Sequence, residues 1–187
     1  MIFRHFLLHV NEANVFVLAC EREREALLVD VGDIDARIID FLEEHRLRLT
    51  TIFVTHDHYD HTGGLSAALA HYDGVVVLSG HGVTGGAKGR KVGHGAEVRI
   101  GQLAGQVLAT PGHTRDSLSL VFPGLVFTGD ALFSGSIGGV TSPQDGRLEV
   151  EQIRKHVFPL PDDYEIHPGH GPSSTVAVER RYNPFFV

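Results

Sequence analysis

The sequence predicts an α/β fold in which two sheets pack face to face and helices cover their outer sides. Apolar runs of strand length gather in two stretches of the chain, and helical segments accompany each stretch. The chain has 187 residues, of which 42 % are hydrophobic and 21 % charged, as is ordinary for a globular protein. We therefore expect residues 1–187 to form a single domain.

The first strand-rich stretch begins with three apolar runs and a helix. Residues 2–10, 14–20 and 26–31 are separated by polar connections, a pattern that is typical of a strand meander. Residues 33–45 place their apolar side chains on one helical stripe, and Asp33 is available to cap the first amides. We expect this segment to be a surface helix on the sheet.

A β-α-β alternation follows. Residues 51–54 and 75–78 are strand-like, and residues 63–72 between them have a helical pattern with an apolar inner face. From Gly80 to Gly95 glycine is so frequent that neither a helix nor a strand is expected. We interpret this segment as a mobile loop.

The second strand-rich stretch ends in helices. The pattern predicts four strands, at residues 97–100, 105–110, 117–122 and 125–129. Two helices follow, at residues 148–158 and 171–182, and Pro184 stops the second of them. Two strand-rich stretches with their own helices favour two packed sheets over one continuous sheet.

Charge and cysteine content exclude several classes of protein. The formal charge of −7 argues against a nucleic-acid partner, because binding to phosphates needs clustered Lys and Arg. Lys88, Arg90 and Lys91 form the only basic cluster, which could bind an acidic substrate tail or be solvated. The single cysteine, Cys20, allows no disulfide within the chain. Residues 1–20 have neither the apolar core of a signal peptide nor a membrane-spanning run, so we predict a cytoplasmic protein with no membrane partner.

The segment "HDHYDH", His56 to His61, follows a predicted buried strand and concentrates metal-binding side chains. Alternate residues of an extended segment point the same way, so His56 and His58 can share one target. Asp60 and His61 follow where the chain turns into a helix, so they point elsewhere and could serve a second ion. The spacing therefore suits two metal ions.

Three further candidate ligands occur at similar places. His113 in "ATPGHT", Asp130 in "VFTGDALF" and His170 in "IHPGHG" each follow a strand-like run and lie beside glycine. Strand ends are where α/β proteins commonly gather ligands, since the sheet fixes their position. Imidazole and carboxylate suit zinc, iron or manganese. Taken alone, a histidine such as His113 is more often a loop or core residue than a ligand, and an aspartate after glycine, such as Asp130, is most often a turn residue.

In this order the motifs resemble a known family. "THDHYDH", followed by His113, Asp130 and His170, resembles the metallo-β-lactamase superfamily, and Asp30 in "LLVDVG" fits the first motif of that superfamily. The segments "TGDALFSGSIG" and "HPGHGPSSTVAVERRYNPF" resemble, more narrowly, the short bacterial hydrolases related to glyoxalase II, the hydroxyacylglutathione hydrolase. The match covers most of the chain and fades in the glycine-rich segment.

The resemblance implies a four-layer αββα sandwich with a binuclear metal site between the sheet edges. It assigns His56, His58 and His113 to the first site, and Asp60, His61 and His170 to the second, with Asp130 and a hydroxide bridging both. Asp60 and Asp130 are thereby the catalytic candidates. Asp30 would orient ligands without binding metal. Asp57 would act in the same way or be a solvated loop residue.

The implied activity is metal-dependent hydrolysis of a small thioester, an acyl derivative of glutathione or a similar thiol. The metal ions, zinc first and iron or manganese as alternatives, lower the pKa of bound water toward about 7. A thiolate also leaves without an acid, because the pKa of a thiol is about 8.5.

Two departures leave the substrate and the activity open. Relatives have a basic residue after "SGSIG", where this chain has Gly139, Val140 and Thr141, and we expect the C-terminal helical domain of full-length glyoxalase II enzymes to be missing. A persulfide dioxygenase with a single iron on His56, His113 and Asp130 is one alternative. A lactonase or β-lactamase is another, and a metal-binding protein without activity is the third.

Overall fold

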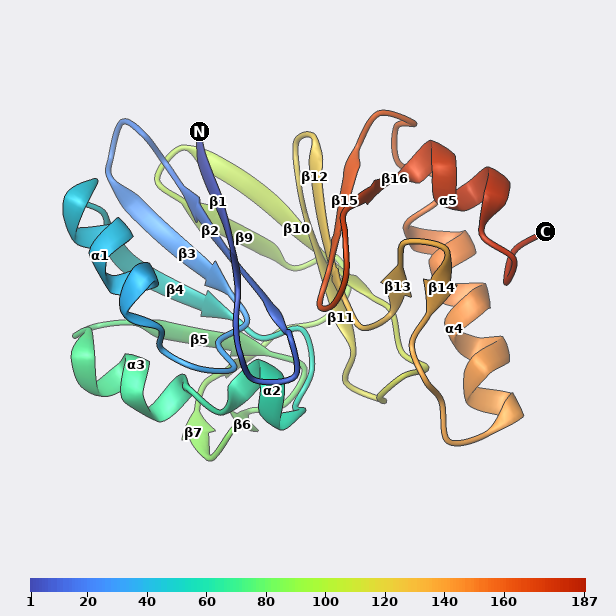
Figure 1. Ribbon diagram of the computed structural model, residues 1–187, viewed down its shortest axis with the longest axis horizontal. Coiled ribbons are helices and arrows are strands. Elements are labelled where there is room, and N and C mark those ends of the chain that lie inside the picture. The colour runs from blue at the N-terminus through green and yellow to red at the C-terminus, as the bar shows by residue number, and fades with distance from the viewer.

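Two six-stranded sheets face each other, and helices cover the outer side of each sheet (Figure 1). The computed structural model describes residues 1–187, and it confirms the predicted four-layer αββα sandwich. In Figure 1 the layers follow one another from the helices of the N-terminal half to the helices of the C-terminal half.

The first sheet presents its parallel strands at its centre. In spatial order its strands are β1 (Ile2–Leu7), β2 (Asn14–Ala19), β3 (Glu25–Val29), β4 (Arg48–Phe53), β5 (Val76–Ser79) and β8 (Arg90–Lys91). The first three form the predicted antiparallel meander, whereas β3, β4 and β5 run parallel. The carboxyl ends of β3 and β4 therefore meet at one edge, which brings Asp30 beside the segment that begins at His56.

The second sheet places three chain segments at the equivalent edge. Its strands are, in spatial order, β16 (Ser174–Thr175), β15 (Glu165–Pro168), β12 (Leu125–Gly129), β11 (Leu118–Phe122), β10 (Leu103–Ala109) and β9 (Glu97–Ile100). Strands β12 and β15 are parallel, and β10 has the same direction because it is two antiparallel pairings away from β12. The segments with His113, Asp130 and His170 follow β10, β12 and β15 at this shared edge.

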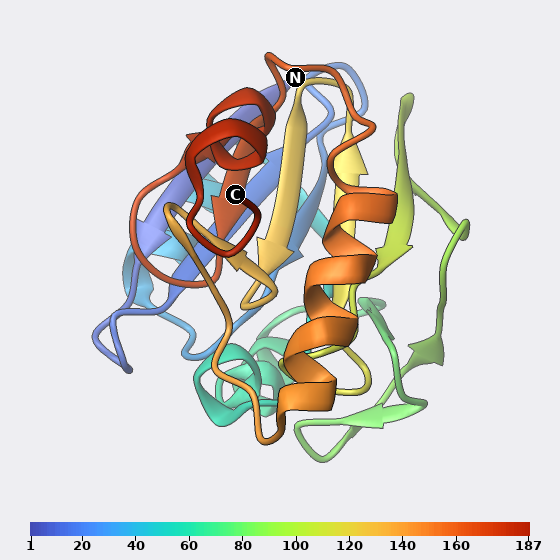
Figure 2. The ribbon, with the colours of Figure 1, turned by 90° about the vertical axis from the view of Figure 1, so that its right-hand side faces the viewer.

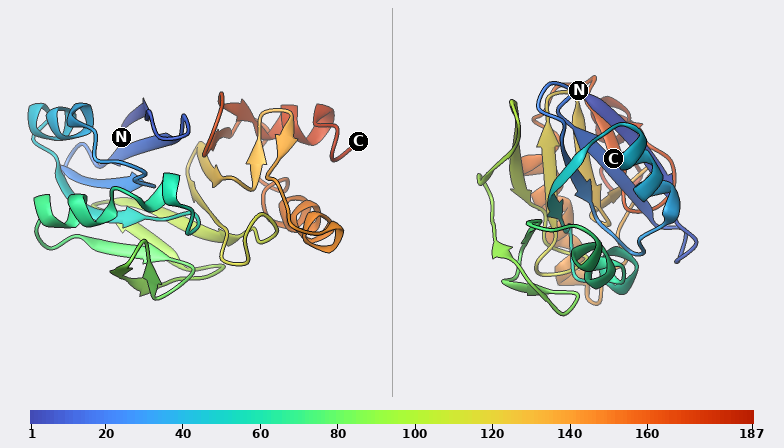
Figure 3. Two further views of the ribbon diagram at one scale, coloured as in Figure 1. Left: turned by 60° about the horizontal axis from the view of Figure 1, so that its bottom comes forward. Right: turned by 90° about the vertical axis from the view of Figure 1, so that its left-hand side faces the viewer.

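The helices lie on the outer faces and two hairpins lie near the sheet edges (Figures 2 and 3). Helices α1 (Ala36–Glu44) and α3 (Leu65–His71) cover the first sheet, and α4 (Pro143–His156) and α5 (Val176–Tyr182) cover the second. Between β4 and α3 is the one-turn α2 (Tyr59–Thr62). The hairpins are β6 (Val83–Thr84) with β7 (Ala87–Lys88), and β13 (Leu132–Phe133) with β14 (Ser136–Ile137). None of the helices has the length and apolar content that a membrane crossing requires.

The core between the sheets is built from alternating strand residues. Phe16 and Phe53 project from the first sheet and pack with Phe122 and Phe127 from the second, in a cluster of 14 buried residues. Burying a side chain of this size contributes about 1.5–3 kcal/mol. Two further clusters hold the helices against the outer faces of the sheets.

The prediction of a structureless loop from Gly80 to Gly95 was wrong. The segment contains β6, β7 and β8, and β8 pairs in parallel with β5. The carboxylate of Asp57 also accepts hydrogen bonds from Thr84 Oγ1, at 2.8 Å, and from the backbone N–H of Gly85, at 2.7 Å. The strand pairing and these hydrogen bonds order the segment despite its glycine content. Asp57 thereby connects the "HDHYDH" segment to the β6–β7 hairpin.

Three helix starts differ from their predicted positions by three or more residues. The last helix, predicted from Gly171, begins at Val176, because Ser174 and Thr175 pair with β15 as strand β16. The first helix begins at Ala36 with Asp35 as its N-cap, because Asp33 accepts instead from the backbone N–H of Ile34. Helix α4 begins at Pro143, five residues before the predicted start at Leu148. Ser142 accepts from the backbone N–H of Asp145 there, and a proline in the first turn needs no hydrogen-bond partner.

Candidate metal centre

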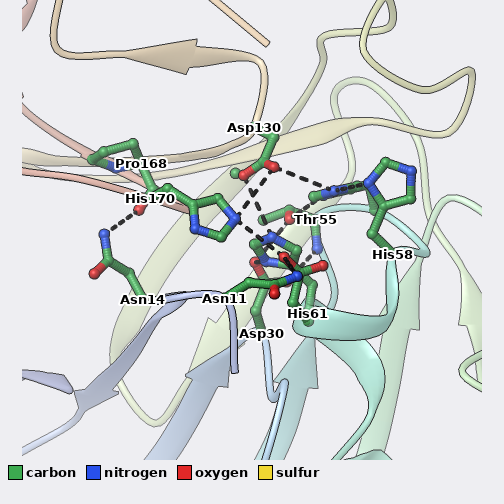
Figure 4. Close-up of polar contacts among 12 residues, drawn as sticks. Asn11, Asn14, Asp30, Thr55, His58, His61, Asp130, Pro168 and His170 are labelled. Carbon is green, nitrogen blue, oxygen red and sulfur yellow. Dashed lines mark hydrogen bonds and ion pairs between the residues drawn. The ribbon is translucent and has the colours of Figure 1, made fainter. Parts of the chain in front are cut away.

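The metal-binding side chains predicted from the sequence converge where the strand ends of the two sheets meet (Figure 4). Their ligand atoms form two groups, and within each group all atoms lie within 4.8 Å of one another. The first group is His56, His58, His113 and Asp130, and the second is Asp60, His61 and His170. The structure therefore brings together all seven residues, from both halves of the chain.

Three imidazole nitrogens of the first group face a common point. His58 Nδ1 lies 3.1 Å from His56 Nε2 and 3.1 Å from His113 Nε2. Nitrogen ligands of a tetrahedral zinc ion are about 3.3 Å apart, given Zn–N bonds of about 2.0–2.1 Å. Burial, together with the charge of His61, lowers the pKa of His56 to about 3, so this imidazole is neutral and able to bind metal at neutral pH.

The second group is built on α2 and the loop after β15. Asp60 and His61 lie in α2, and His170 Nε2 approaches Asp60 Oδ2 at 3.3 Å. Burial lowers the pKa of His61, but the carboxylates of Asp30 and Asp130 outweigh it and raise the pKa to about 10. The surroundings of His61 therefore favour a cation, which can be a proton or a metal ion.

Asp130 lies between the two groups. Its Oδ2 is 3.8 Å from His56 Nε2, 3.7 Å from His113 Nε2 and 3.5 Å from His170 Nε2. Its Oδ1 is 3.4 Å from His61 Nε2. Burial raises the pKa of Asp130, but the imidazoles around it, His61 first, outweigh burial and lower it to about 2, so the carboxylate is ionised.

The buried polar atoms of the site fit a divalent metal ion. His61 Nε2 and Asp130 Oδ1 are buried, lie 3.4 Å apart without a well-formed hydrogen bond and have no other partner, although unpaired buried groups are costly. Gly169 leaves the space beside them free, since a Cβ there would lie 2.1 Å from Asp130 Oδ1 and 2.7 Å from His61 Cε1. Five imidazoles and two carboxylates with this convergence indicate divalent metal ions.

Asp30 orients one imidazole of the second group. It accepts hydrogen bonds from the backbone N–H of Thr55, at 2.7 Å, from Thr55 Oγ1, at 2.8 Å, and from His61 Nδ1, at 2.9 Å. With Nδ1 carrying the proton, Nε2 of His61 is directed toward Asp130. Asp30 has a φ of 60°, a left-handed conformation that a non-glycine residue rarely adopts, at a position with three buried donors.

Two asparagines near the site were not predicted from the sequence. Asn11 Nδ2 donates to Asp60 Oδ2 at 3.1 Å, and Asn14 Nδ2 donates to the carbonyl of Pro168 at 2.9 Å (Figure 4). Asn14 Nδ2 also donates to the carbonyl of Gly171, at 2.9 Å. The turn between β1 and β2 therefore supports both Asp60 and the loop with His170. Asn14 is an amide at the start of an otherwise apolar, fully buried strand, and this was the signal available in the sequence.

Glu149 on α4 was also not predicted. It is fully buried, and its Oε1 accepts from the backbone N–H of His113 at 3.1 Å. Burial raises the pKa of Glu149 to about 8. Gly112 packs so closely on Glu149 that a Cβ at Gly112 would lie 2.1 Å from the Glu149 Cβ. Helix α4 thus holds the turn that presents His113.

Substitution of Asn11 should weaken binding at the second group without unfolding the protein. In Asn11→Ala, Asp60 loses its hydrogen-bond donor, and we expect metal affinity to fall by about tenfold or more, as for other groups that orient ligands. Competition with a chelator measures the affinity. Glu12→Ala is the matched control, because Glu12 is exposed in the same turn, also has a positive φ and makes no side-chain hydrogen bond or ion pair. Equal affinities of the two variants would contradict the role of Asn11.

Metal binding should become tighter as pH rises. The pKa of His61, raised to about 10, means that a metal ion must displace a proton, so affinity should rise by about tenfold per pH unit up to that value. The stability of the metal-free protein should change with pH in the opposite direction. The charged His61 stabilises the fold fully below a pH of about 6.5, and this stabilisation is lost as the pH rises toward about 10. Calorimetric titrations with metal in buffers of different ionisation enthalpy measure both affinity and proton release. A pH-independent affinity would contradict this expectation.

Comparison with known proteins gives one family. The sequence profile of the Metallo-beta-lactamase superfamily matches residues 10–170. A "Probable metallo-hydrolase" from Streptococcus pyogenes serotype M6 is 31 % identical, with 95 % of this chain and 87 % of that protein covered. The hydroxyacylglutathione hydrolase of Idiomarina loihiensis is 30 % identical, and the match covers 89 % of this chain. The same match covers only 64 % of that enzyme's length.

Solved structures agree with this result. The crystal structure of ETHE1 from Myxococcus xanthus has a TM-score of 0.87 and 34 % sequence identity, with 98 % of this chain and 84 % of that chain covered. TTHA1623, solved in a di-iron-bound form, has a TM-score of 0.82 and 26 % identity, with 97 % and 99 % covered. The similarity therefore extends over essentially the whole sandwich.

Proposed function

The chain belongs to the metallo-beta-lactamase superfamily, and from that membership we propose that residues 1–187 form a single binuclear metal-dependent hydrolase domain that cleaves thioesters. The observation that carries the proposal is the position of Asp130, whose two carboxylate oxygens face the imidazoles of both ligand groups. A carboxylate shared in this way suits two ions side by side. The di-iron-bound form of TTHA1623 supports a binuclear site.

We assign the first ion to His56, His58 and His113 and the second to Asp60, His61 and His170, with Asp130 between them. Zinc is the first candidate for both ions, and iron and manganese are alternatives, since the donor set accepts all three. Bound metal ions would lower the pKa of a water molecule to about 7 and polarise the carbonyl of a substrate.

The residues of the chain prepare this chemistry in three ways. His56 is neutral, so it binds a cation without first losing a proton. Asp30 holds the Nδ1 proton of His61, and the carbonyl of Gly139 accepts from His113 Nδ1 at 2.7 Å, so both rings direct Nε2 into the site. Asp130 stays ionised at neutral pH.

The thioester is the favoured substrate because its leaving group needs no acid. A thiolate leaves readily, as the pKa of a thiol is about 8.5, whereas an amine requires a proton donor. The similarity to hydroxyacylglutathione hydrolases supports a small-molecule thioester, such as an acyl derivative of glutathione or a similar thiol. The predicted cytoplasmic location and the absence of a nucleic-acid partner stay predictions.

The test is elemental analysis of freshly purified protein, combined with thioester cleavage and oxygen uptake on the same sample. Two ions per chain with release of free thiol are expected. A fully loaded sample that leaves a panel of thioesters intact would rule out the proposal.

A persulfide dioxygenase is the second candidate. The similarity to ETHE1 is compatible with it, and a single iron on His56, His113 and Asp130 would use only the first ligand group. A single iron at the first group would leave Asp60, His61 and His170 without a metal ion, although their ligand atoms converge. One iron per chain with oxygen consumption would decide for the dioxygenase.

A further inference from the structure

A groove lies beside α4, outside the two ligand groups. Its volume is about 560 Å³, within the range of sites that bind small molecules. Its walls are the loop between β14 and α4, the first half of α4, and Phe185 in the C-terminal tail. Figure 2 shows this loop running alongside α4.

The groove borders the first ligand group. Gly138 and Gly139 line it, and Gly138 packs against His113 while Gly139 accepts a hydrogen bond from it. Besides accepting the hydrogen bond from His113, the Gly138–Gly139 segment packs so closely that a Cβ at Gly138 would lie 2.8 Å from His113 Cβ and 2.1 Å from the carbonyl oxygen of Asp130. The Gly138–Gly139 segment therefore forms a wall between the groove and His113, whose Nε2 faces the candidate metal centre.

The lining of the groove is apolar apart from one cation. Ile137, Val140, Val150 and Phe185 supply its hydrophobic side chains, and Phe185 is 50 % exposed, unusually so for a large aromatic residue. Arg147 is the only charged residue of the lining; it is exposed and makes no hydrogen bond or ion pair. No carboxylate lines the groove. This combination is complementary to an apolar chain that ends in an anionic group.

We infer that the groove binds an apolar chain with an anionic end, which is part of the thioester substrate. The inference rests on the proposed function, because it identifies the apolar chain as the part of the thioester substrate that lies away from the carbonyl. Such a chain can belong to the acyl group or to the thiol, and the two sources are separated below.

Gly146 offers a direct way to fill the groove. It lies in α4, and a Cβ there would meet only Val140 Cγ2, at 3.3 Å, so Gly146→Leu keeps the helix and places its side chain in the groove. Arg147→Gln removes the charge. Lys155→Leu and Lys155→Gln are the matched controls, because Lys155 is exposed on the same helix, does not line the groove, and makes no hydrogen bond or ion pair.

The first measurement is calorimetric binding of hexanesulfonate to the metal-loaded protein, with methanesulfonate for comparison. We expect hexanesulfonate to bind at least about tenfold more tightly, since each buried methylene adds to the affinity. Gly146→Leu should abolish this advantage, Arg147→Gln should weaken hexanesulfonate binding several-fold, and the Lys155 variants should match the wild type. Equal binding of hexanesulfonate to wild type and Gly146→Leu would overturn the inference.

The second measurement is turnover in two arms. One arm compares adipoyl with acetyl thioesters of N-acetylcysteamine, and the other compares acetyl thioesters of 6-mercaptohexanoate and ethanethiol. We expect Gly146→Leu to lower kcat/KM by about tenfold or more for the long substrate of one arm only, which identifies the acyl or the thiol side. Unchanged kcat/KM ratios in both arms would overturn the assignment to the substrate while leaving thioester hydrolysis intact. A third outcome separates the two proposals. If the wild type binds hexanesulfonate but cleaves no thioester, and Gly146→Leu abolishes the binding, the groove is supported and the proposed function is refuted.

Discussion

Asp130→Asn should reduce thioester turnover by about a thousandfold or more, because the shared carboxylate is replaced by an amide that cannot serve two cations. Asp130 is the residue whose two oxygens face both ligand groups, His61 on one side and His56 and His113 on the other. The amide keeps the shape of the side chain but not its charge. Steady-state kinetics of the metal-loaded protein measure the loss, and elemental analysis should show fewer than two ions per chain.

Asp163→Asn is the control for this substitution. Asp163 is exposed and makes no hydrogen bond or ion pair, so the same chemical change there should leave both turnover and metal content unaltered. Retention of two ions and more than about a tenth of the turnover in Asp130→Asn would contradict the shared role of this carboxylate.

Asp30→Ala should be the most destabilising single substitution around the site. It leaves three donors without an acceptor, namely the N–H and hydroxyl of Thr55 and Nδ1 of His61, all in buried positions. Loss of such a partner costs about 3–5 kcal/mol of the free energy of unfolding. Urea denaturation of the metal-free protein measures this change.

Asp30→Asn separates folding from metal binding if the alanine variant fails to fold. The amide fills the same volume and can accept from Thr55, but it no longer provides a charge beside His61. Metal affinity should therefore fall by about ten- to a hundredfold with a smaller loss of stability. Asp40→Asn, at an exposed position of α1 where the side chain makes no hydrogen bond or ion pair, should change neither quantity. An unaltered metal affinity in Asp30→Asn would argue against its orienting role.

The local periodicity of the sequence was sufficient for the layered fold and for the pairing of His56 with His58. Both depend on the two-residue repeat of extended chain and on apolar runs, which act over a few residues. The structure confirms two packed sheets, and it brings His113, Asp130 and His170 to the same edge as the "HDHYDH" segment.

Features that depend on distant contacts were not predictable in this way. Asn14 donates hydrogen bonds to carbonyls more than 150 positions away, and Glu149 in α4 supports His113 in the turn after β10, so neither residue has a local pattern. The segment from Gly80 to Gly95 is ordered by pairing with β5 and by Asp57, partners that override the weak preferences of glycine. Contacts of this kind are set by the folded topology.

The division of the seven candidate ligands between the two halves of the chain has a mechanical consequence. Four come from the first half of the chain, between His56 and His61, and three come from the second half, at His113, Asp130 and His170. Ions held by residues of both halves would connect the two sheets to each other. Separation of the sheets would then require release of the ions. At a free ion concentration of a hundred times the dissociation constant, each bound ion would add about 2.7 kcal/mol to the free energy of unfolding.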